Sequence, residues 1–343
     1  MSSGHREVGT MLQMSGAVVD IVYRIAALPE AGGEVMATSQ DMSAGGGFNA
    51  MVAAARAGLK VFYGGMHGTG PFADIVRTAL KAEGFHLLRP QVPDQDQGSC
   101  IVLVDGDGER SFVSKDGAEG TSGRGFPSID GGYDWILLSG YTLCYPDSRD
   151  ALHTWVQDLP DGAGFVFDPS PVVAHIPAPI LRDVLAKARC VSCNGREAEV
   201  ITGIAAPAEA AEALLSAHCP AADCVVVRLG SEGCLVAERD SEPVRIEGFR
   251  MQSVRDTNGA GDTHIGAILA AISRGEGWEV AARYANAAAA LSTQVSGPAT
   301  APTHDETIRF LNENLPEWRQ SKSGGAHPGA ARTKTHQPMA ERF

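Results

Sequence analysis

Apolar and polar positions follow one another along the chain in blocks that predict strands separated by helices. Several apolar runs lack the alternation of a half-exposed strand, which is typical of strands buried on both faces of a parallel sheet. Such runs stand at 134–139, 164–170, 188–194 and 224–230. The intervening segments predict helices at about 49–57, 72–83 and 148–158, one that begins at Arg196, and one near 207–217. This order predicts a doubly wound α/β fold, with a mainly parallel sheet covered by helices on both faces.

Two regions near the N-terminal third of the chain depart from this pattern of buried strands and helices. The run at 11–25 is apolar apart from a few positions, among them Gly16 and Asp20, and predicts the first strand, with a carboxylate near its end. Residues 98–118 predict two short alternating strands joined by the turn DGDG. We expect segments of about 24–43 and 97–116 to form a small antiparallel sheet that projects over the main domain as a lid.

The composition indicates one large domain with loosely structured ends. We expect a flexible N-terminus at 1–11, the domain at 12–318, and a disordered tail at 319–343, which is rich in Gly, Pro and polar residues. The 28 basic and 41 acidic residues give a formal charge of −13, and the basic residues are scattered, which argues against a nucleic-acid groove. No apolar run approaches the roughly 18 residues that span a bilayer. We therefore expect a cytoplasmic protein with no nucleic-acid or membrane partner.

The cysteines do not predict a disulfide framework or a zinc site. Seven cysteines stand at irregular spacing, and the pair Cys190 and Cys193 is a lone C-x-x-C without a second pair. Buried strand thiols are the better interpretation.

The stretch DTNGAGDTHIGA at 256–267 carries the strongest chemical signal. If a helix begins near Asp262, the backbone N–H groups of Gly259, Ala260 and Gly261 lie at its positive end and form an anion site. A carboxylate beside a bound anion is electrostatically unfavourable, which suggests that it takes a proton from an attacking hydroxyl. The alternative is that Asp262 only caps the helix.

This stretch resembles the C-terminal signature of the ribokinase, or PfkB, family of carbohydrate kinases, which reads D-T-x-G-A-G-D. The resemblance extends over roughly residues 12–315. It implies that Asp262 is the general base, that residues 259–261 form the anion hole, and that ATP donates the phosphoryl group. Thr257 within the motif is assigned to the nucleotide side.

Two further segments are similar to the substrate side of the family's site. Gly16 and Asp20 resemble a sugar-contacting G-x-x-x-D, in which a carboxylate accepts hydrogen bonds from adjacent hydroxyls. The segment GGGFNAMVAAARAG resembles the N-terminal signature and implies substrate contacts from Gly45, Gly46, Gly47 and Asn49. Many members carry a larger residue at the position of Gly46. The alternatives are a simple turn at Asp20 and a dinucleotide site at the glycines.

Three other segments are similar to cofactor sites of the family. NGREAEVITG resembles the N-x-x-E motif, so Asn194 and Glu197 would orient Mg²⁺ through water, or else form an ordinary helix cap. RLGSEGCLV, with Arg228, Gly230 and Gly233, resembles the nucleotide loop, or else forms a plain hairpin turn. Asp256, with backbone carbonyls near Ser292 and Gly297, is similar to a site that holds K⁺ in some members.

Some positions depart from the family pattern. His264 stands where a Phe is common; a helix turns about 200° in two residues, so its ring should point away from Asp262. Residues 137–144 lack the carboxylate that ribokinases commonly place near their substrate, which puts ribose in doubt. Lys115 is interpreted as a solvated lid residue, with contact to a substrate as the alternative.

We therefore expect an ATP-dependent sugar kinase. A nucleoside kinase of the same fold is the alternative, for which Phe48, Phe112 and Tyr141 are candidate base contacts. A non-catalytic sugar-binding protein and a dinucleotide-dependent dehydrogenase are more distant alternatives. An exposed edge of the lid sheet would permit a homodimer.

Overall fold

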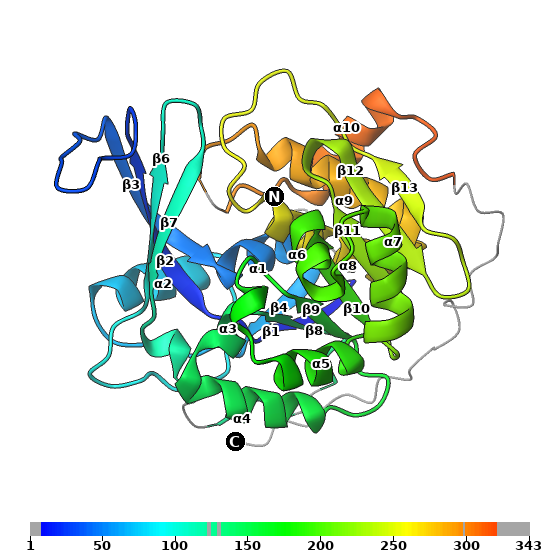
Figure 1. Ribbon diagram of the computed structural model, residues 1–343, viewed down its shortest axis with the longest axis horizontal. Coiled ribbons are helices and arrows are strands. Elements are labelled where there is room, and N and C mark those ends of the chain that lie inside the picture. Colours follow the sequence, from blue (N-terminus) through cyan, green and yellow to red (C-terminus); the bar gives the residue numbers. More distant parts are fainter. Residues whose placement is uncertain (1–7, 122–124, 129–131, 298, 321–343) are drawn as a thin grey trace, which may run out of the picture.

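The computed structural model describes residues 8–121, 125–128, 132–297 and 299–320. These residues form a nine-stranded sheet flanked by helices and a separate four-stranded sheet at one side (Figure 1). The large sheet runs, in spatial order, β13 (Val244–Glu247), β12 (Gly233–Glu238), β11 (Cys224–Arg228), β10 (Cys190–Asn194), β9 (Phe165–Asp168), β8 (Trp135–Ser139), β1 (Gly9–Gln13), β4 (Leu59–Tyr63) and β5 (His86–Leu87). All pairings from β11 to β5 are parallel, and β12 and β13 add an antiparallel edge.

Helices cover both faces of the large sheet, as the uninterrupted apolar strands predict. Met11 belongs to one hydrophobic core and the next residue, Leu12, to the other, since successive side chains of a strand point to opposite faces. The first core packs on α1 (Gly47–Arg56), α2 (Pro71–Ala82), α8 (Ala260–Ser273), α9 (Trp278–Ser292) and α10 (His304–Asn314). The second packs on α4 (Pro146–Gln157), α5 (Ala178–Lys187), α6 (Gly195–Thr202) and α7 (Pro207–Ala213).

Short helical segments complete the described part of the chain. A π-helical turn, Leu214–His218, extends α7 and accounts for the full helix predicted near 207–217. The others are α3 (Tyr141–Cys144) and three 3₁₀ turns at Ala118–Gly120, Val173–His175 and Gly230–Glu232. No single helix among the described residues is long and apolar enough to cross a membrane; α6 and α7 with its extension reach that length and composition only as a bent pair.

The lid is present, but its sheet differs from the prediction. It consists of β3 (Ser39–Gly46), β2 (Ala17–Arg24), β6 (Ser99–Val104) and β7 (Arg110–Lys115), in that order. The β6–β7 hairpin is confirmed, whereas β2 was not assigned to the lid. The β2–β6 pair is parallel, so the sheet is mixed, because the chain passes through the main domain between β3 and β6 and returns in the direction of β2.

The predicted first strand is in fact two strands. β1 pairs with β4 and β8 in the large sheet, and β2 crosses into the lid. The break lies at 14–16, where the carbonyl of Gly16 accepts a hydrogen bond from the Gly47 N–H (2.9 Å) and the Ala17 N–H donates to the Tyr63 hydroxyl (3.0 Å). Asp20 therefore lies within a lid strand and not at the end of a main-sheet strand.

Both predicted ends need a correction. β1 begins at Gly9, so the last residues of the predicted flexible N-terminus belong to the large sheet; residues 1–7 lie outside the described residues. At the other end, Arg283 donates a hydrogen bond to the carbonyl of Gln320 (3.2 Å), which holds the first residues of the predicted tail. Residues 321–343 lie outside the described residues.

Candidate active site

The candidate site lies at the carboxyl ends of the parallel strands, where open α/β sheets place their sites. Asp168, Asn194 and Arg228 are the last residues of β9, β10 and β11. α8 begins beside them, because a Cβ built on Gly261 would lie 3.6 Å from the guanidinium carbon of Arg228. The lid strand β2 brings Asp20 from the opposite side.

The turn before α8 has the predicted form. α8 begins at Ala260, and Gly259 holds the N-cap position with φ 73°, a left-handed conformation that glycine adopts without strain. No side chain caps this helix end. The Ala260 N–H donates to the carbonyl of Thr257 (3.3 Å), so an anion here would be met first by the other N–H groups of the turn. Asp262 is the third helical residue, and the alternative that it occupies the N-cap position is wrong.

Asp262 lies in surroundings that suit a base. Its Oδ2 accepts a hydrogen bond from Asn49 Nδ2 at 3.2 Å. Burial, together with the negative charge of Asp168, raises the pKa of Asp262 to about 7, although the Asn49 hydrogen bond and Arg228 oppose the rise. A carboxyl group with this pKa can accept a proton near neutral pH.

Asn49 also offers an acceptor to the site. Its side chain is 4% exposed, and its Oδ1 has no hydrogen-bond partner among the described residues. A buried carbonyl oxygen without a partner is costly, so such an atom marks a place where a ligand hydroxyl is expected.

Asp20 lies at the same site, beside the turn before α8. Asn258 Nδ2 donates to Asp20 Oδ2 at 3.3 Å, and burial raises the pKa of Asp20 to about 6. The glycines of the N-terminal motif leave room for this carboxylate: a Cβ on Gly45 would lie 2.2 Å from Asp20 Oδ2, and one on Gly47 would lie 3.0 Å from the carbonyl oxygens of Ser15 and Gly16. Gly46 has φ 61°.

Gly16 is explained by packing in this structure. A Cβ at this position would lie 2.6 Å from the Cβ of Glu119, and its carbonyl holds the start of α1 through Gly47. The predicted sugar contact of Gly16 is thus accompanied by a structural reason for glycine that needs no ligand.

Asn194 and Glu197 form a reciprocal cap at the start of α6. The Glu197 N–H donates to Asn194 Oδ1 and the Asn194 N–H donates to Glu197 Oε2, both at 2.8 Å, while Asn194 Nδ2 donates to Glu197 Oε1 at 2.7 Å. The alternative of a helix cap is therefore correct as geometry. Burial and the charge of Asp168 raise the pKa of Glu197.

Arg228 and three carboxylates make up the charged centre of the site. Arg228 Nη2 lies 3.6 Å from both Asp168 Oδ1 and Glu197 Oε2, and Arg228 also interacts electrostatically with Asp262. One guanidinium therefore faces the Asp168, Glu197 and Asp262 carboxylates. Among the described residues, no three His, Cys, Asp or Glu side chains lie close enough together to hold a metal ion directly, so a Mg²⁺ ion at this centre would have to be bound through water.

Asp168 was missed by the sequence reasoning. It ends the apolar run FVFD and precedes Pro169, so it is a carboxylate at the end of a buried strand. The same signal drew attention to Asp20 and would have identified Asp168.

The glycine loop between β11 and β12 is a hairpin turn. Gly230 has φ 62° and Gly233 has φ 97°, and a Cβ on Gly233 would lie 2.1 Å from the carbonyl oxygen of Ile246. β11 and β12 are antiparallel neighbours, so the hairpin alternative describes the backbone. The turn follows Arg228 directly and thus adjoins the charged centre.

The residues predicted to hold K⁺ make hydrogen bonds of their own. The Gly297 N–H donates to Asp256 Oδ2 (3.2 Å), and the carbonyl of Ser292 accepts a hydrogen bond from Thr300 Oγ1 (2.9 Å). Asp256 Oδ1 is bound by Arg110, whose Nη1 also contacts Thr257 Oγ1.

His264 packs in the interior of the protein. It is 3% exposed, and its Nε2 lies 3.1 Å from Asn286 Oδ1 on α9. Burial lowers its pKa to about 3, so the ring is neutral at physiological pH.

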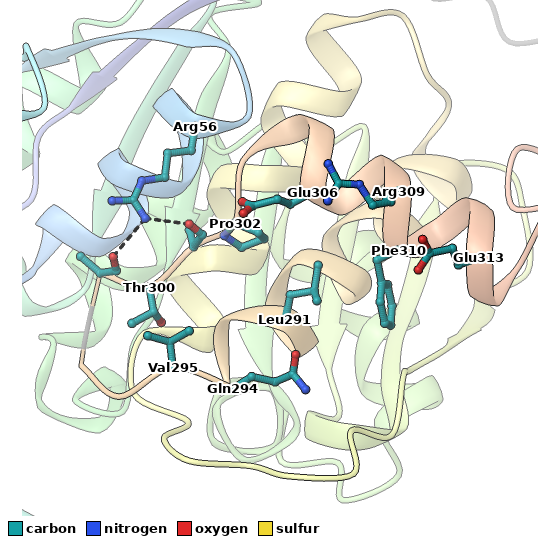
Figure 2. A pocket seen from close by; sticks show the side chains of 12 residues that line it. Arg56, Leu291, Gln294, Val295, Thr300, Pro302, Glu306, Arg309, Phe310 and Glu313 are labelled. Atoms are coloured by element: carbon teal, nitrogen blue, oxygen red, sulfur yellow. Dashed lines mark hydrogen bonds between the residues drawn. The ribbon is translucent and has the colours of Figure 1, made fainter.

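A hollow beside α10 is lined by none of the predicted site residues (Figure 2). Its walls are the end of α9, residues 294–295 and 299–302, and one face of α10. Arg56 lies at its rim and donates to the backbone carbonyls of Ala301 (2.8 Å) and Ala299 (3.5 Å).

Comparison with known proteins decides the family. Residues 15–305 match the model of the pfkB family carbohydrate kinase. The chain belongs to this family. It is 31% identical to the uncharacterized sugar kinase YegV of Escherichia coli (strain K12), over 87% of this chain and 93% of that protein. The enzyme is accordingly a phosphotransferase, a sugar or nucleoside kinase of the ribokinase type, and a dehydrogenase is ruled out.

Solved structures show the same fold. The Arabidopsis thaliana ribokinase complexed with ribose and ATP has a TM-score of 0.73 at 24% identity, over 88% of this chain and 98% of that one. A nucleoside kinase of Burkholderia thailandensis in complex with inosine has a TM-score of 0.73 at 20% identity, over 88% and 97% of the chains. ATP use is therefore seen in a ribokinase of this fold, and both substrate classes occur among the neighbours.

Proposed function

We propose that this pfkB-family enzyme transfers the γ-phosphate of ATP to a hydroxyl group of a small carbohydrate, with Asp262 as general base. The observation that carries the proposal is the position of Asp262, which lies at the start of α8 beside uncapped N–H groups and has a pKa of about 7. A base titrating near neutral pH beside an anion site suits proton removal during phosphoryl transfer.

The acceptor is held between Asp20 and Asn49. Asp20 accepts hydrogen bonds from substrate hydroxyls, and the unpartnered Oδ1 of Asn49 accepts another. Asp262 then removes the proton of the attacking hydroxyl. The N–H groups of Gly259, Ala260 and Gly261 stabilise the charge on the transferring phosphoryl group.

The nucleotide lies on the side of Arg228. We assign the triphosphate to Arg228 and Thr257 and the wrapping of ATP to the Gly230 and Gly233 turn. Asn194 and Glu197 hold Mg²⁺ through water, with Asp168 as a further negative charge. The ion supplies neutralisation of the phosphate charge. We place the reaction in the cytoplasm, where ATP and Mg²⁺ are available.

A nucleoside is the second candidate acceptor, favoured by one observation. Phe112 is 57% exposed. Val22 lies two residues after Asp20 and so shares its face of the lid sheet. Val22 pairs with Val102 and Val102 pairs with Phe112, so Phe112 lies on this face too. Phe48 is no longer a candidate base contact, since it is 5% exposed and packs edge-on against Phe85. Tyr141 is 40% exposed. Burial raises its pKa, with smaller contributions from Cys100 and Asp262, which supports a position near Asp262.

A homodimer through the lid remains part of the proposal. β3 and β7 are the edge strands of the lid sheet, and each carries exposed apolar side chains, with Met42 at 44% and Val113 at 60% exposure. Edge strands of this kind pair readily with a second copy.

The test is ATP consumption by wild type and by Asp262→Asn with a panel of pentoses, hexoses, sugar acids and nucleosides, in the presence of Mg²⁺. We expect turnover with one acceptor class, reduced by about 10²–10⁴-fold in the variant. Unchanged turnover in Asp262→Asn would contradict the mechanism. Acceptor binding by calorimetry without any turnover would favour the non-catalytic sugar-binding protein.

A further inference from the structure

A lid arginine reaches the signature motif at Asp256. Arg110, the first residue of β7, places Nη2 2.5 Å from Asp256 Oδ1 and Nη1 2.6 Å from Thr257 Oγ1. The Asp256 side chain is 6% exposed and that of Arg110 is 18% exposed, so the ion pair is largely shielded from water. Breaking a pair of this kind leaves an uncompensated buried charge.

The surrounding oxygens are already engaged. The Ser292 carbonyl accepts from Thr300, and the carbonyl of Thr293 accepts from the N–H groups of Arg255 (2.8 Å) and Asp256 (3.1 Å). Arg56 donates hydrogen bonds to the carbonyls of Ala299 and Ala301, which precede α10 (Figure 2). A monovalent cation at Asp256 would face the Arg110 guanidinium at close range, which is repulsive, and would compete with the hydrogen bonds that the Ser292 and Thr293 carbonyls accept.

Asp256 links this pair to the anion hole. Its Oδ1 also accepts a hydrogen bond from the Asn258 N–H at 2.9 Å, and Asn258 directly precedes Gly259 and contacts Asp20. The positive charge beside Asp256 therefore helps to set the conformation of the 258–261 turn. The N–H groups of this turn are the ones proposed to bind the phosphoryl group.

We propose that Arg110 takes the place of a monovalent cation at Asp256, so that the lid itself supplies the positive charge that sets the anion-hole turn. Arg110 is a positioning residue, which acts on the phosphoryl group through Asp256 and Asn258. Two consequences follow. The enzyme needs no K⁺ for activity, and a free guanidinium ion restores the activity and stability that are lost when the Arg110 side chain is removed.

Chemical rescue of Arg110→Ala tests this proposal. The full chain is measured in a tetramethylammonium buffer of constant ionic strength, with KCl or guanidinium chloride added at millimolar concentration, far below the denaturing range. Thermal unfolding of the protein without substrates is the first readout, since an ion that binds the folded state raises the midpoint. Turnover, which rests on the proposed kinase function, is the second.

We expect Arg110→Ala to lose about tenfold or more of kcat/KM and to regain most of it with guanidinium. Guanidinium should also raise the thermal midpoint of this variant and leave that of wild type unchanged. Arg110→Lys, which keeps the charge without the two-pronged contact, should show intermediate activity. The rescue should vanish in Arg110→Ala/Asp256→Asn.

The matched control is Lys115→Ala. Lys115 lies on the same strand but on the opposite face, is 79% exposed at its side chain and contacts the neighbouring Asp116. It should behave as wild type. Stimulation of wild type by K⁺ beyond twofold, full activity in Arg110→Ala, or failure of guanidinium to stabilise that variant would each overturn the proposal. The last result is independent of turnover, so it stays separate from a failure of the kinase assignment.

Discussion

Asn49 on α1 and Asp262 on α8 are 213 positions apart in the chain and are joined by a hydrogen bond of 3.2 Å from Nδ2 to Oδ2. This bond stabilises the ionised carboxylate, against the effect of burial and of Asp168. The pKa of Asp262 therefore depends on opposing effects of neighbouring residues, and a single substitution can remove each of them.

Asn49→Ala should raise the pKa of Asp262, because the variant loses the donor that favours the ionised form. Since the base must be ionised to act, the acidic limb of kcat/KM against pH should move to higher pH, by about one unit at most. The KM for the acceptor should also rise, because Oδ1 is lost. Asn314→Ala on the outer helix α10 serves as control, and an unmoved limb would contradict the assignment of Asp262.

Asp168→Asn should shift the same limb in the opposite direction. Removing its negative charge lowers the pKa of Asp262 and of Glu197, so activity should persist to lower pH. The variant should also need more Mg²⁺ for half-maximal rate, because the site has lost one of its carboxylates. A pH–rate profile at saturating Mg²⁺ separates the two effects, and a limb displaced to higher pH would rule out this electrostatic account.

Asp262→Asn should stabilise the fold at high pH. An Asp whose pKa rises to about 7 on folding binds its proton more tightly in the folded state, so its ionisation costs stability as pH increases from about 4 towards 7. The amide removes that cost. The thermal midpoint should increase by about 2 °C or more at pH 8 and change little at pH 4. Equal shifts at both pH values would show that packing, not charge, is responsible.

The order of strands and helices was readable from the sequence because each apolar run and each helix carries its own local pattern. The helix at 207–217 and the hairpin at 98–118 were located in this way. The division of the run at 11–25 was not, because what separates β1 from β2 is a set of contacts from Tyr63 and Gly47, which are remote in sequence.

The difference between local patterns and remote contacts also explains which site residues could be predicted from the sequence. Asp262, Asn49 and Glu197 belong to spaced motifs and could be named from the sequence. The structure brings Asn49 to Asp262 and brings both Glu197 and Asp262 near Arg228, while their roles stay predictions. Arg110 has no motif around it; its role appears only when the lid strand meets the turn before α8. The expected K⁺ site stays a prediction, because its ligands would be backbone carbonyls, which leave no trace in the sequence.

Gly45→Ala should weaken acceptor binding with little effect on folding. The added Cβ would lie 2.2 Å from Asp20 Oδ2, so the carboxylate must move from its place beside Asn258. We expect the acceptor KM to rise by about tenfold or more, the cost of a displaced charged hydrogen bond, while the KM for ATP stays near that of wild type. Ser39→Ala, at the exposed far end of the same strand, is the control. Equal effects on both substrates would point to general disruption of the lid.

Phe112 decides between the two acceptor classes. Its ring is exposed on the lid face that carries Asp20, whereas its neighbour Val113, with similar exposure, is on the opposite face. A nucleobase stacked on this ring would lose its partner in Phe112→Ala, so the KM for a nucleoside should rise by about tenfold, whereas a free sugar held by Asp20 and Asn49 should be affected less than twofold. Val113→Ala should change neither. If Phe112→Ala leaves the KM of the turned-over nucleoside unaltered, the ring does not contact the base, and the lid arranges the site only through Asp20 and Arg110.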